Sequence, residues 1–279
     1  MDMTGRVCLV TGANRGIGLA TSIEFARAGA HVCLVCRDPS RAEAAADEVR
    51  RSAHTDAVEF LVADLSSQRA ILELVVRFRQ RHMRLDVLVN NAATVSEQRQ
   101  VSVDGRELVF AVNHLAYFLL TRLLLDSLLA ARDAAIVNVA ATNHRDITEN
   151  IEDLDSRSGY DMRTAYKRSK LANVSFTLEL ARRLVGTSVR VNSFCPNVVA
   201  TDLLMQFRRV PTEQWSSRLA AEESPRAAAM IALNLATSAN TGRYYEEGVE
   251  VTPSPQACDP DLARRLWRQC SILTGLDPI

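Results

Sequence analysis

The sequence has no excess of charge of either sign. Its 33 basic and 33 acidic side chains give a formal net charge of zero. No segment gathers Lys and Arg without acidic or apolar residues between them. Because binding to a phosphate backbone requires a basic surface, this balance argues against nucleic acid as a partner.

Long hydrophobic runs are also missing. Six residues precede the first apolar run, which begins at Val7, so we expect no signal or transit segment. Polar residues interrupt the leucine-rich stretch 115–129, which is typical of a buried amphipathic helix and not of a membrane span. We therefore expect a cytoplasmic protein with no membrane partner.

The six cysteines lack the paired spacing of a zinc site or of a secreted disulfide framework. We therefore expect reduced thiols and no bound metal. Cys33 and Cys36 form a CxxC pattern inside an apolar run. Because side chains three positions apart on a strand point to opposite faces, this pattern predicts two core residues and no redox pair.

What the chain does contain is a regular alternation of short apolar runs and long amphipathic segments. The runs are 7–10, 31–36, 58–62, 87–89, 136–139 and 189–194. Parallel strands need helical crossovers and are buried on both faces, so this alternation predicts the α/β class. We expect one doubly wound Rossmann-type parallel sheet with helices on both faces.

Helical periodicity supports the segments between the strands. Apolar residues at 71, 74, 75 and 78 form one stripe, and residues at 171, 174, 178, 181 and 184 form another. Spacings of three and four place such residues on one helix face, so both stripes are predicted core.

The length is compatible with a single domain over residues 1–279, which includes a C-terminal helical tail at about 259–279. Residues 201–224 lose strand character, and we expect them to be an insertion over the carboxyl end of a strand. Such an insertion shapes a substrate pocket. Its apolar candidates are Leu203, Leu204, Met205, Phe207 and Trp215.

A glycine-rich turn, Thr-Gly-Ala-Asn-Arg-Gly-Ile-Gly at 11–18, follows the first predicted strand and opens a predicted helix at 17–28. In this context Gly12 allows a tight turn, Gly16 lets the backbone approach a diphosphate, and Gly18 lets helix and strand pack closely. The helix N-terminus then offers N–H groups to the anion. An ordinary glycine turn is the alternative.

Two arginines bear on the choice of nicotinamide cofactor. An NAD-preferring fold places Asp or Glu at the end of the second strand, but here Cys36 is followed by Arg37. Arg37 and Arg15 of the loop would pair with a 2′-phosphate, which favours NADP(H). The alternative is that both are surface arginines. Asp64, after the third strand, would accept a bond from the adenine amine or cap the next helix.

Tyr166 and Lys170 are four residues apart in a predicted helix, so their side chains share one face. A nearby ammonium favours phenolate and would lower the pKa of the tyrosine, making it a general acid or base. This spacing also occurs by chance in many helices.

Together these motifs, with the Asn-Asn-Ala-Ala turn at 90–93, Asn113 and the segment from Cys195 through Pro196 to Thr201, resemble the short-chain dehydrogenase/reductase family. The resemblance covers nearly the whole chain. Residues 112–121 and 253–257 are similar to its retinol dehydrogenase and WW-domain oxidoreductase-like branch, although we expect neither a membrane anchor nor a WW module in this chain.

The resemblance implies a role for each matching residue. Tyr166 would protonate a carbonyl oxygen while NADPH delivers hydride, Lys170 would bind the nicotinamide ribose, and Asn113 would support a proton-relay water. Thr201 and the backbone near Val199 would hold the carboxamide, and Asn197 occupies a usual glycine position. The implied cofactor cleft also includes Asn14, Ile17, Leu65, Asn91, Ala92 and Pro196.

One family residue is missing. The resemblance aligns Ala141 with the serine that donates a hydrogen bond to the substrate oxygen, and losing one such donor typically costs about 10²–10³ in turnover. Thr142 would supply a replacement hydroxyl if the strand end turns, or would form a local turn bond. Asn143 and His144 are further candidates.

The leading hypothesis is therefore an NADPH-dependent oxidoreductase acting on the carbonyl or alcohol of an apolar small molecule. Two alternatives stay open: a lyase or isomerase that uses Tyr166 without net redox change, and a non-catalytic NADP-binding protein. A homo-oligomer is possible, because helices such as 166–184 pair in relatives.

Overall fold

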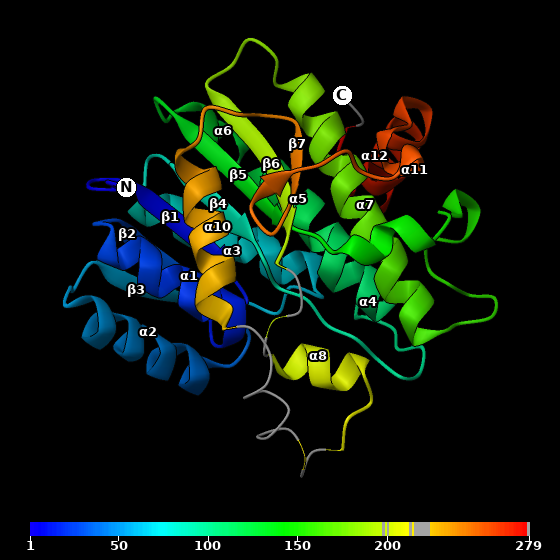
Figure 1. Ribbon diagram of the computed structural model, residues 1–279, viewed down its shortest axis with the longest axis horizontal. Helices are drawn as coiled ribbons and strands as arrows, with labels where there is room; N and C mark the ends of the chain where they lie inside the picture. The colour runs from blue at the N-terminus through cyan, green and yellow to red at the C-terminus, as the bar shows by residue number, and fades with distance from the viewer. Residues whose placement is uncertain (197–198, 200, 212–213, 215–223, 278–279) are drawn as a thin grey trace.

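The computed structural model describes residues 1–196, 199, 201–211, 214 and 224–277. Within them an eight-stranded sheet has the order β3-β2-β1-β4-β5-β6-β7-β8 and forms the centre of the molecule (Figure 1). The first seven strands are parallel and β8 is antiparallel. The predicted doubly wound sheet is confirmed.

The strands lie where the apolar runs predict them. They are β1 (Val7–Thr11), β2 (His31–Cys36), β3 (Val58–Val62), β4 (Val87–Asn90), β5 (Ala134–Val139) and β6 (Val189–Cys195). The pair β7 (Arg243–Glu246) and β8 (Val249–Glu250) was not predicted. These two strands are too short and too charged to stand out as apolar runs.

Helices cover both faces of the sheet (Figure 1). On one face α1 (Gly16–Arg27), α2 (Pro39–Ala53) and α10 (Pro225–Thr237) pack on an apolar cluster that includes Phe25, Val49 and Leu235. The other face carries α3 (Gln68–Arg81), α5 (Ala116–Leu123), α6 (Leu125–Leu129), α7 (Met162–Arg183) and α12 (Pro260–Thr274). Shorter helices are α4 (Leu108–Phe110), α8 (Asp202–Phe207) and α11 (Pro255–Cys258), with a π-helical turn η1 (Ala111–Leu115) and 3-10 turns η2 (Thr142–Asp146) and η3 (Ile151–Asp153).

The predicted helix stripes form core contacts. The side chains at 71, 74, 75 and 78 of α3 are buried, and those at 171, 174 and 181 of α7 and at 184 just after it are buried too. Residue 178 is partly buried. Cys33 belongs to one core cluster and Cys36 to the other, which confirms that they point to opposite faces. Among the described residues, no helix is both long and apolar enough to cross a bilayer.

Candidate active site

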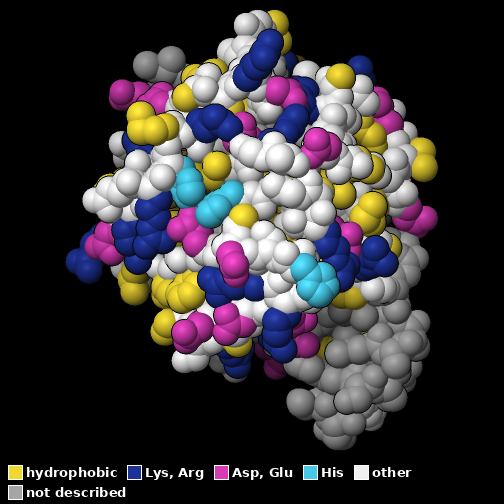
Figure 2. All heavy atoms as spheres, turned by 90° about the vertical axis from the view of Figure 1, so that its left-hand side faces the viewer, with side chains coloured by type: hydrophobic (Ala, Val, Ile, Leu, Met, Phe, Trp, Pro, Cys, Tyr) yellow, Lys and Arg dark blue, Asp and Glu magenta, His cyan; other side chains and the backbone are white. Residues whose placement is uncertain are grey.

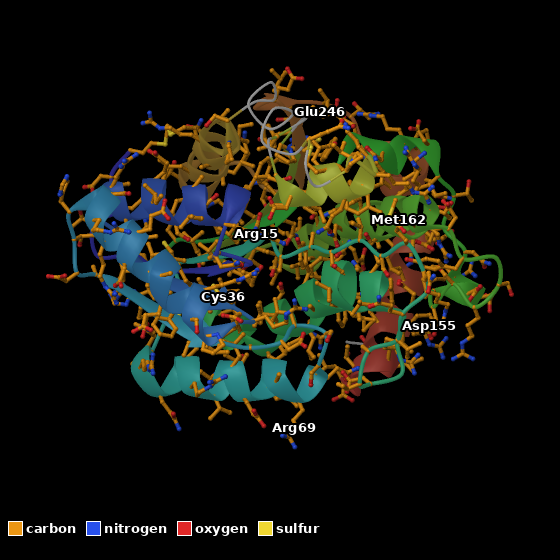
Figure 3. All side chains as sticks on the ribbon, turned by 90° about the horizontal axis from the view of Figure 1, so that it is seen from below. Arg15, Cys36, Arg69, Asp155, Met162 and Glu246 are labelled. Atoms are coloured by element: carbon orange, nitrogen blue, oxygen red, sulfur yellow. The ribbon has the colours of Figure 1, made fainter. Side chains whose placement is uncertain are left out.

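A cavity of about 630 Å³ opens beside the carboxyl ends of the central strands, on the side where α8 lies. Figure 3 looks at the molecule from that side and labels Arg15 and Cys36, which both line the cavity. Most of the residues predicted for the cofactor line it as well: Gly12, Asn14, Arg15, Gly16, Ile17, Arg37, Asp64, Leu65, Asn91, Ala92, Tyr166, Lys170, Pro196, Val199 and Thr201. Gly18 and Asn113 are not among its lining residues.

The glycine loop has a backbone that other residues would adopt only with strain. Gly12 and Gly16 have φ angles of 64° and 56°. A Cβ on Gly12 would lie 2.8 Å from Ala92 Cα, and one on Gly18 would lie 2.3 Å from the Gly12 carbonyl oxygen. Gly18 therefore serves helix-to-strand packing, as predicted, and does not face the cavity.

Helix α1 begins at this loop without a side-chain cap. The Arg15 backbone is extended at the N-cap position, and Gly16 and Ile17 of the first turn line the cavity. Uncapped N–H groups at a helix N-terminus bind anions, because they supply both hydrogen bonds and the positive end of the helix dipole. These residues fit the diphosphate of a dinucleotide.

The asparagine turn after β4 holds the glycine loop in place. Asn91 Nδ2 donates to the carbonyl oxygens of Thr11 and Gly12 at 2.8 and 3.3 Å. The Thr11 hydroxyl in turn accepts from the backbone N–H groups of Asn91 and Ala92 at 2.8 and 3.0 Å. The loops that follow β1 and β4 are thus fixed to one another, and residues of both line the cavity.

The arginines expected at the 2′-phosphate differ in their surroundings. Arg15 forms an ion pair with Asp202 at the start of α8, so its charge is already matched. Arg37 is exposed, lines the cavity and forms no ion pair among the described residues. Arg41, one helical turn further on, also lines the cavity without an ion pair in that part of the chain. Sequence reasoning missed Arg41.

Asp64 lines the cavity but does not cap a helix. Its Oδ1 accepts from the Ser66 backbone N–H at 2.9 Å, whereas Ser67 is the N-cap of α3 and accepts from Ala70. The proposed cap is therefore wrong, because the N-cap position lies three residues later, at Ser67. The carboxylate of Asp64 stays exposed at the cavity.

Tyr166 and Lys170 lie on one face of α7, as their spacing predicts. Lys170 Nζ is 5.5 Å from the centre of the Tyr166 ring and donates to the Val139 carbonyl oxygen at 3.0 Å. Burial lowers the pKa of Lys170 from 10.5 to about 8. Burial also raises the pKa of Tyr166, opposite to the expected lowering, because desolvation disfavours the phenolate and Cys195 adds to the same shift. The phenol is therefore a proton donor at neutral pH.

Asn113 is fully buried in the π-helical turn η1, and its side chain does not reach the cavity. Its Oδ1 accepts from the Thr94 N–H at 2.8 Å, and its Nδ2 donates to Ser169 Oγ at 3.1 Å. Its carbonyl oxygen accepts from Asn173 at 2.9 Å. These bonds tie the segment after β4 to helix α7, so the residue positions Tyr166 and Lys170. The relay water stays a prediction.

Ala141, which occupies the position of the family's serine, lies just after the end of β5. Ala141 and Thr142 line the same cavity as Tyr166, and the exposed Thr142 hydroxyl forms no hydrogen bond within the described segments. His144 is buried instead, between the Ala141 carbonyl at 2.8 Å and the Ser254 N–H at 3.1 Å. His144 is therefore structural, whereas Asn143 also lines the cavity.

Helix α8 covers the cavity with apolar side chains. Leu203, Leu204 and Phe207 line it, and the Phe207 ring lies 5.0 Å from the Tyr166 ring. Met205 is buried and is not a lining residue, because the helix turns it away. Trp215 and Asn197, both singled out from the sequence, lie outside the described residues.

Comparison with known proteins agrees with this geometry. The short chain dehydrogenase family model matches residues 6–212. Human retinol dehydrogenase 13 is 36% identical over 98% of this chain and 86% of its own length. This chain belongs to the short chain dehydrogenase family.

Solved structures of similar proteins have the same fold. An uncharacterized protein from Mycobacterium paratuberculosis superimposes with a TM-score of 0.81 at 30% identity, covering 100% of this chain and 96% of that one. The Pseudomonas aeruginosa RhlG/NADP active-site complex has a TM-score of 0.69 at 26% identity, covering 94% and 98%. The expected family, its retinol dehydrogenase-like branch and the expected enzyme class are confirmed for this short chain dehydrogenase.

Proposed function

We propose that the protein is an NADP(H)-dependent oxidoreductase that interconverts the carbonyl and alcohol forms of an apolar small molecule. The observation that carries this proposal is that the glycine loop, Arg37 and the Tyr166–Lys170 pair line the same cavity. The first two parts fit a phosphorylated dinucleotide, and the third supplies a proton donor where its nicotinamide end would lie. A reduction needs both parts in one pocket.

The cofactor preference rests on charge. Arg37 and Arg41 offer two guanidinium groups without carboxylate partners in the described part of the chain, and no acidic side chain ends β2. Guanidinium groups bind phosphate through paired hydrogen bonds. That the RhlG relative is a complex with NADP supports the same choice.

The chemistry divides between cofactor and chain. A bound NADPH supplies the hydride. The neutral Tyr166 hydroxyl donates its proton to the carbonyl oxygen, and the raised pKa of this phenol keeps that proton in place until the oxygen becomes basic. Lys170, held by the Val139 carbonyl, offers its remaining N–H donors to the ribose. In the alcohol-oxidising direction Tyr166 must first lose its proton.

The substrate class follows from α8 and from the relatives. Leu203, Leu204 and Phe207 give the cavity an apolar wall next to Tyr166. Relatives named retinol dehydrogenase make a long apolar aldehyde such as retinal the first compound to test. The Thr142 hydroxyl at the same wall takes the place of the donor that Ala141 lacks.

The test is NADPH consumption with a panel of apolar aldehydes and ketones that includes retinal. We expect turnover with the wild-type chain and a loss of about 10²-fold or more in Tyr166→Phe, which keeps the ring and removes the proton donor. Met205→Leu, a change away from the cavity, is the matched control. Equal rates in wild type and Tyr166→Phe would overturn the redox assignment and would favour a non-redox or non-catalytic role.

A further inference from the structure

A second group of chemically active side chains lies at the opposite end of the sheet. His31 is the first residue of β2, Glu59 is the second residue of β3, and His82 follows the last residue of α3. The amino ends of the strands lie there, whereas the cavity opens at their carboxyl ends. The proposed redox function uses none of these residues.

The three side chains converge because of strand alternation. Cys33 of β2 and Leu61 of β3 face the core cluster on which α3 packs, so His31 and Glu59, two positions away on each strand, face the same side. His82 ends the helix on that side, with its ring 5.0 Å from Phe78 and 5.1 Å from His31. Figure 2 faces this part of the surface and shows two histidine side chains together beside an acidic one.

The donor atoms are close enough to share one ion. His31 Nε2 lies 3.3 Å from Glu59 Oε1, His82 Nε2 contacts the same oxygen, and one ligand atom from each residue lies within 4.8 Å of the others. Bonds of about 2.0–2.2 Å in a tetrahedral zinc site separate neighbouring ligand atoms by roughly 3.3–3.6 Å. Small side-chain rotations therefore suffice for binding.

The neighbours of Glu59 leave one of its two carboxylate oxygens available to bind a metal ion. Arg81 donates to its Oε2 at 2.7 Å, which leaves Oε1 directed at the two imidazoles. Burial alone would raise the pKa of Glu59, but hydrogen bonds from His82 and Arg81 outweigh it and lower the pKa, so the group is a carboxylate at neutral pH. The side chains are 36%, 20% and 14% exposed for His31, Glu59 and His82, so an ion can enter from solvent.

We propose that His31, Glu59 and His82 form a zinc(II) site that joins β2, β3 and the end of α3. Two imidazoles and one carboxylate are a ligand set typical of zinc, and the fourth position is open to water. The site is independent of the proposed NADP(H) function. Strands β2 and β3 already pair through their backbones, and α3 packs on the same core cluster. A metal would add a direct link from the end of α3 to both strands, so we expect it to act on stability and not on turnover.

The test is titration of tag-free, chelator-treated full-length protein with ZnCl₂, followed by calorimetry and by thermal unfolding. All variants carry Cys258→Ser, which removes the exposed thiol as a competing ligand. We expect one zinc ion per chain and a higher unfolding temperature, because a ligand that binds the native state stabilises it. His31→Gln and His82→Gln should each weaken binding by at least about tenfold, since even second-shell changes cost that much.

His54→Gln is the matched control, because His54 is exposed at the end of α2 and is not part of the cluster. Its zinc affinity should equal that of the parent. Cobalt(II) in the parent should give the visible absorption of a tetrahedral site, and this band should be lost in His82→Gln. Zinc binding unchanged in the two ligand variants, or absent in the folded parent, would show a hydrogen-bonded His-Glu-His cluster and would overturn the proposal.

Discussion

At the scale of single residues, the first prediction concerns which side chain donates a hydrogen bond to the substrate oxygen, since Ala141 has no hydroxyl. Thr142 follows it on the same cavity wall, and its side chain is exposed there. If Thr142 donates to the substrate oxygen, removing its hydroxyl costs about 10²-fold in kcat. We therefore expect Thr142→Val to lose that activity and Thr142→Ser to keep most of it, as measured by steady-state NADPH consumption.

The companion change is Ala141→Ser, which puts a hydroxyl back at the end of β5. We expect it to raise the kcat of Thr142→Val, because one donor then replaces the other. A Thr142→Val enzyme as active as wild type would show that the donor lies elsewhere.

A second prediction at this scale concerns Arg37 and Arg41. Each hydrogen bond to a charged group contributes about 1.5–3 kcal/mol. The double variant Arg37→Gln/Arg41→Gln should therefore raise the Kd for NADPH by at least about tenfold and leave the Kd for NADH nearly unchanged. Arg69→Gln, at an exposed arginine of α3, is the control for general charge loss. A parallel loss for both cofactors would contradict a 2′-phosphate role.

Lys170 gives a prediction about pH. Its pKa is lowered by burial to about 8, so its ammonium form is complete well below pH 8 and disappears as the pH rises through that value. Because kcat/KM reports the ionisation of the free enzyme, kcat/KM for NADPH should fall above about pH 8. Lys170→Arg keeps its charge over this range and should flatten the profile. The same fall in the arginine variant would assign the titration to another group.

At the scale of secondary-structure elements, helix α7 determines where Tyr166 lies. Buried side-chain bonds hold it to the sheet: Asn138 of β5 donates to Thr177, and Asn90 of β4 donates to Asn138. At its beginning, the Asp161 carboxylate accepts from the Thr164 N–H at 2.8 Å. The helix is therefore fixed both along its length and at the end nearest the tyrosine.

Removing this cap should cost stability in a pH-dependent way. We expect Asp161→Ala to lower the free energy of unfolding by about 1 kcal/mol at pH 7 in urea titrations. The bond from Thr164 lowers the pKa of Asp161, so the folded state gains stability above the ordinary carboxyl pKa and loses it as the pH falls through the folded value.

Asp161→Asn keeps an acceptor for the cap but has no titrating group. Its stability should match wild type at pH 7 and should show a smaller loss in acid. A wild-type acid profile in Asp161→Asn would show that this carboxylate does not contribute to the pH dependence.

The sequence predicts an element when the pattern of that element's own residues is sufficient to identify it. The six apolar runs predict β1 to β6 within two residues at each end, because strands buried on both faces must be apolar throughout. The pair β7 and β8 is not predicted. Its strands bond to β6 and to each other, and a run such as Arg243–Glu246 becomes a strand through that pairing and not through its own pattern.

The same distinction applies to the site. The glycine loop and the Tyr166–Lys170 pair are short-range patterns, and the structure brings both to one cavity. Contacts between residues far apart in the sequence leave no such pattern and were not predicted. They are the ion pair of Arg15 with Asp202, the hydrogen bonds of Asn113 with Thr94 and Ser169, and the cluster of His31, Glu59 and His82. Each joins residues from different elements. The pKa of Tyr166 depends on burial, which spacing alone does not reveal.

At the scale of the whole molecule, the two ends of the sheet carry different chemistry. The cavity with its dinucleotide-binding features lies at the carboxyl ends of the strands, and the histidine cluster lies at the amino ends. Distant sites without shared partners contribute additively to stability. The cytoplasmic location, the single-domain boundaries and the oligomeric state stay predictions at this scale.

The central claim is that hydride moves between NADP(H) and an apolar substrate in this cavity. Its most direct measurement uses NADPH carrying deuterium at the transferring position of nicotinamide C4, with retinal and the substrates found in the panel, followed by mass spectrometry of the alcohol. We predict that the product alcohol gains one deuterium with the wild-type chain and that Tyr166→Phe forms at least about 10²-fold less of it. NADPH binding without any deuterated alcohol from the wild-type protein would contradict the account.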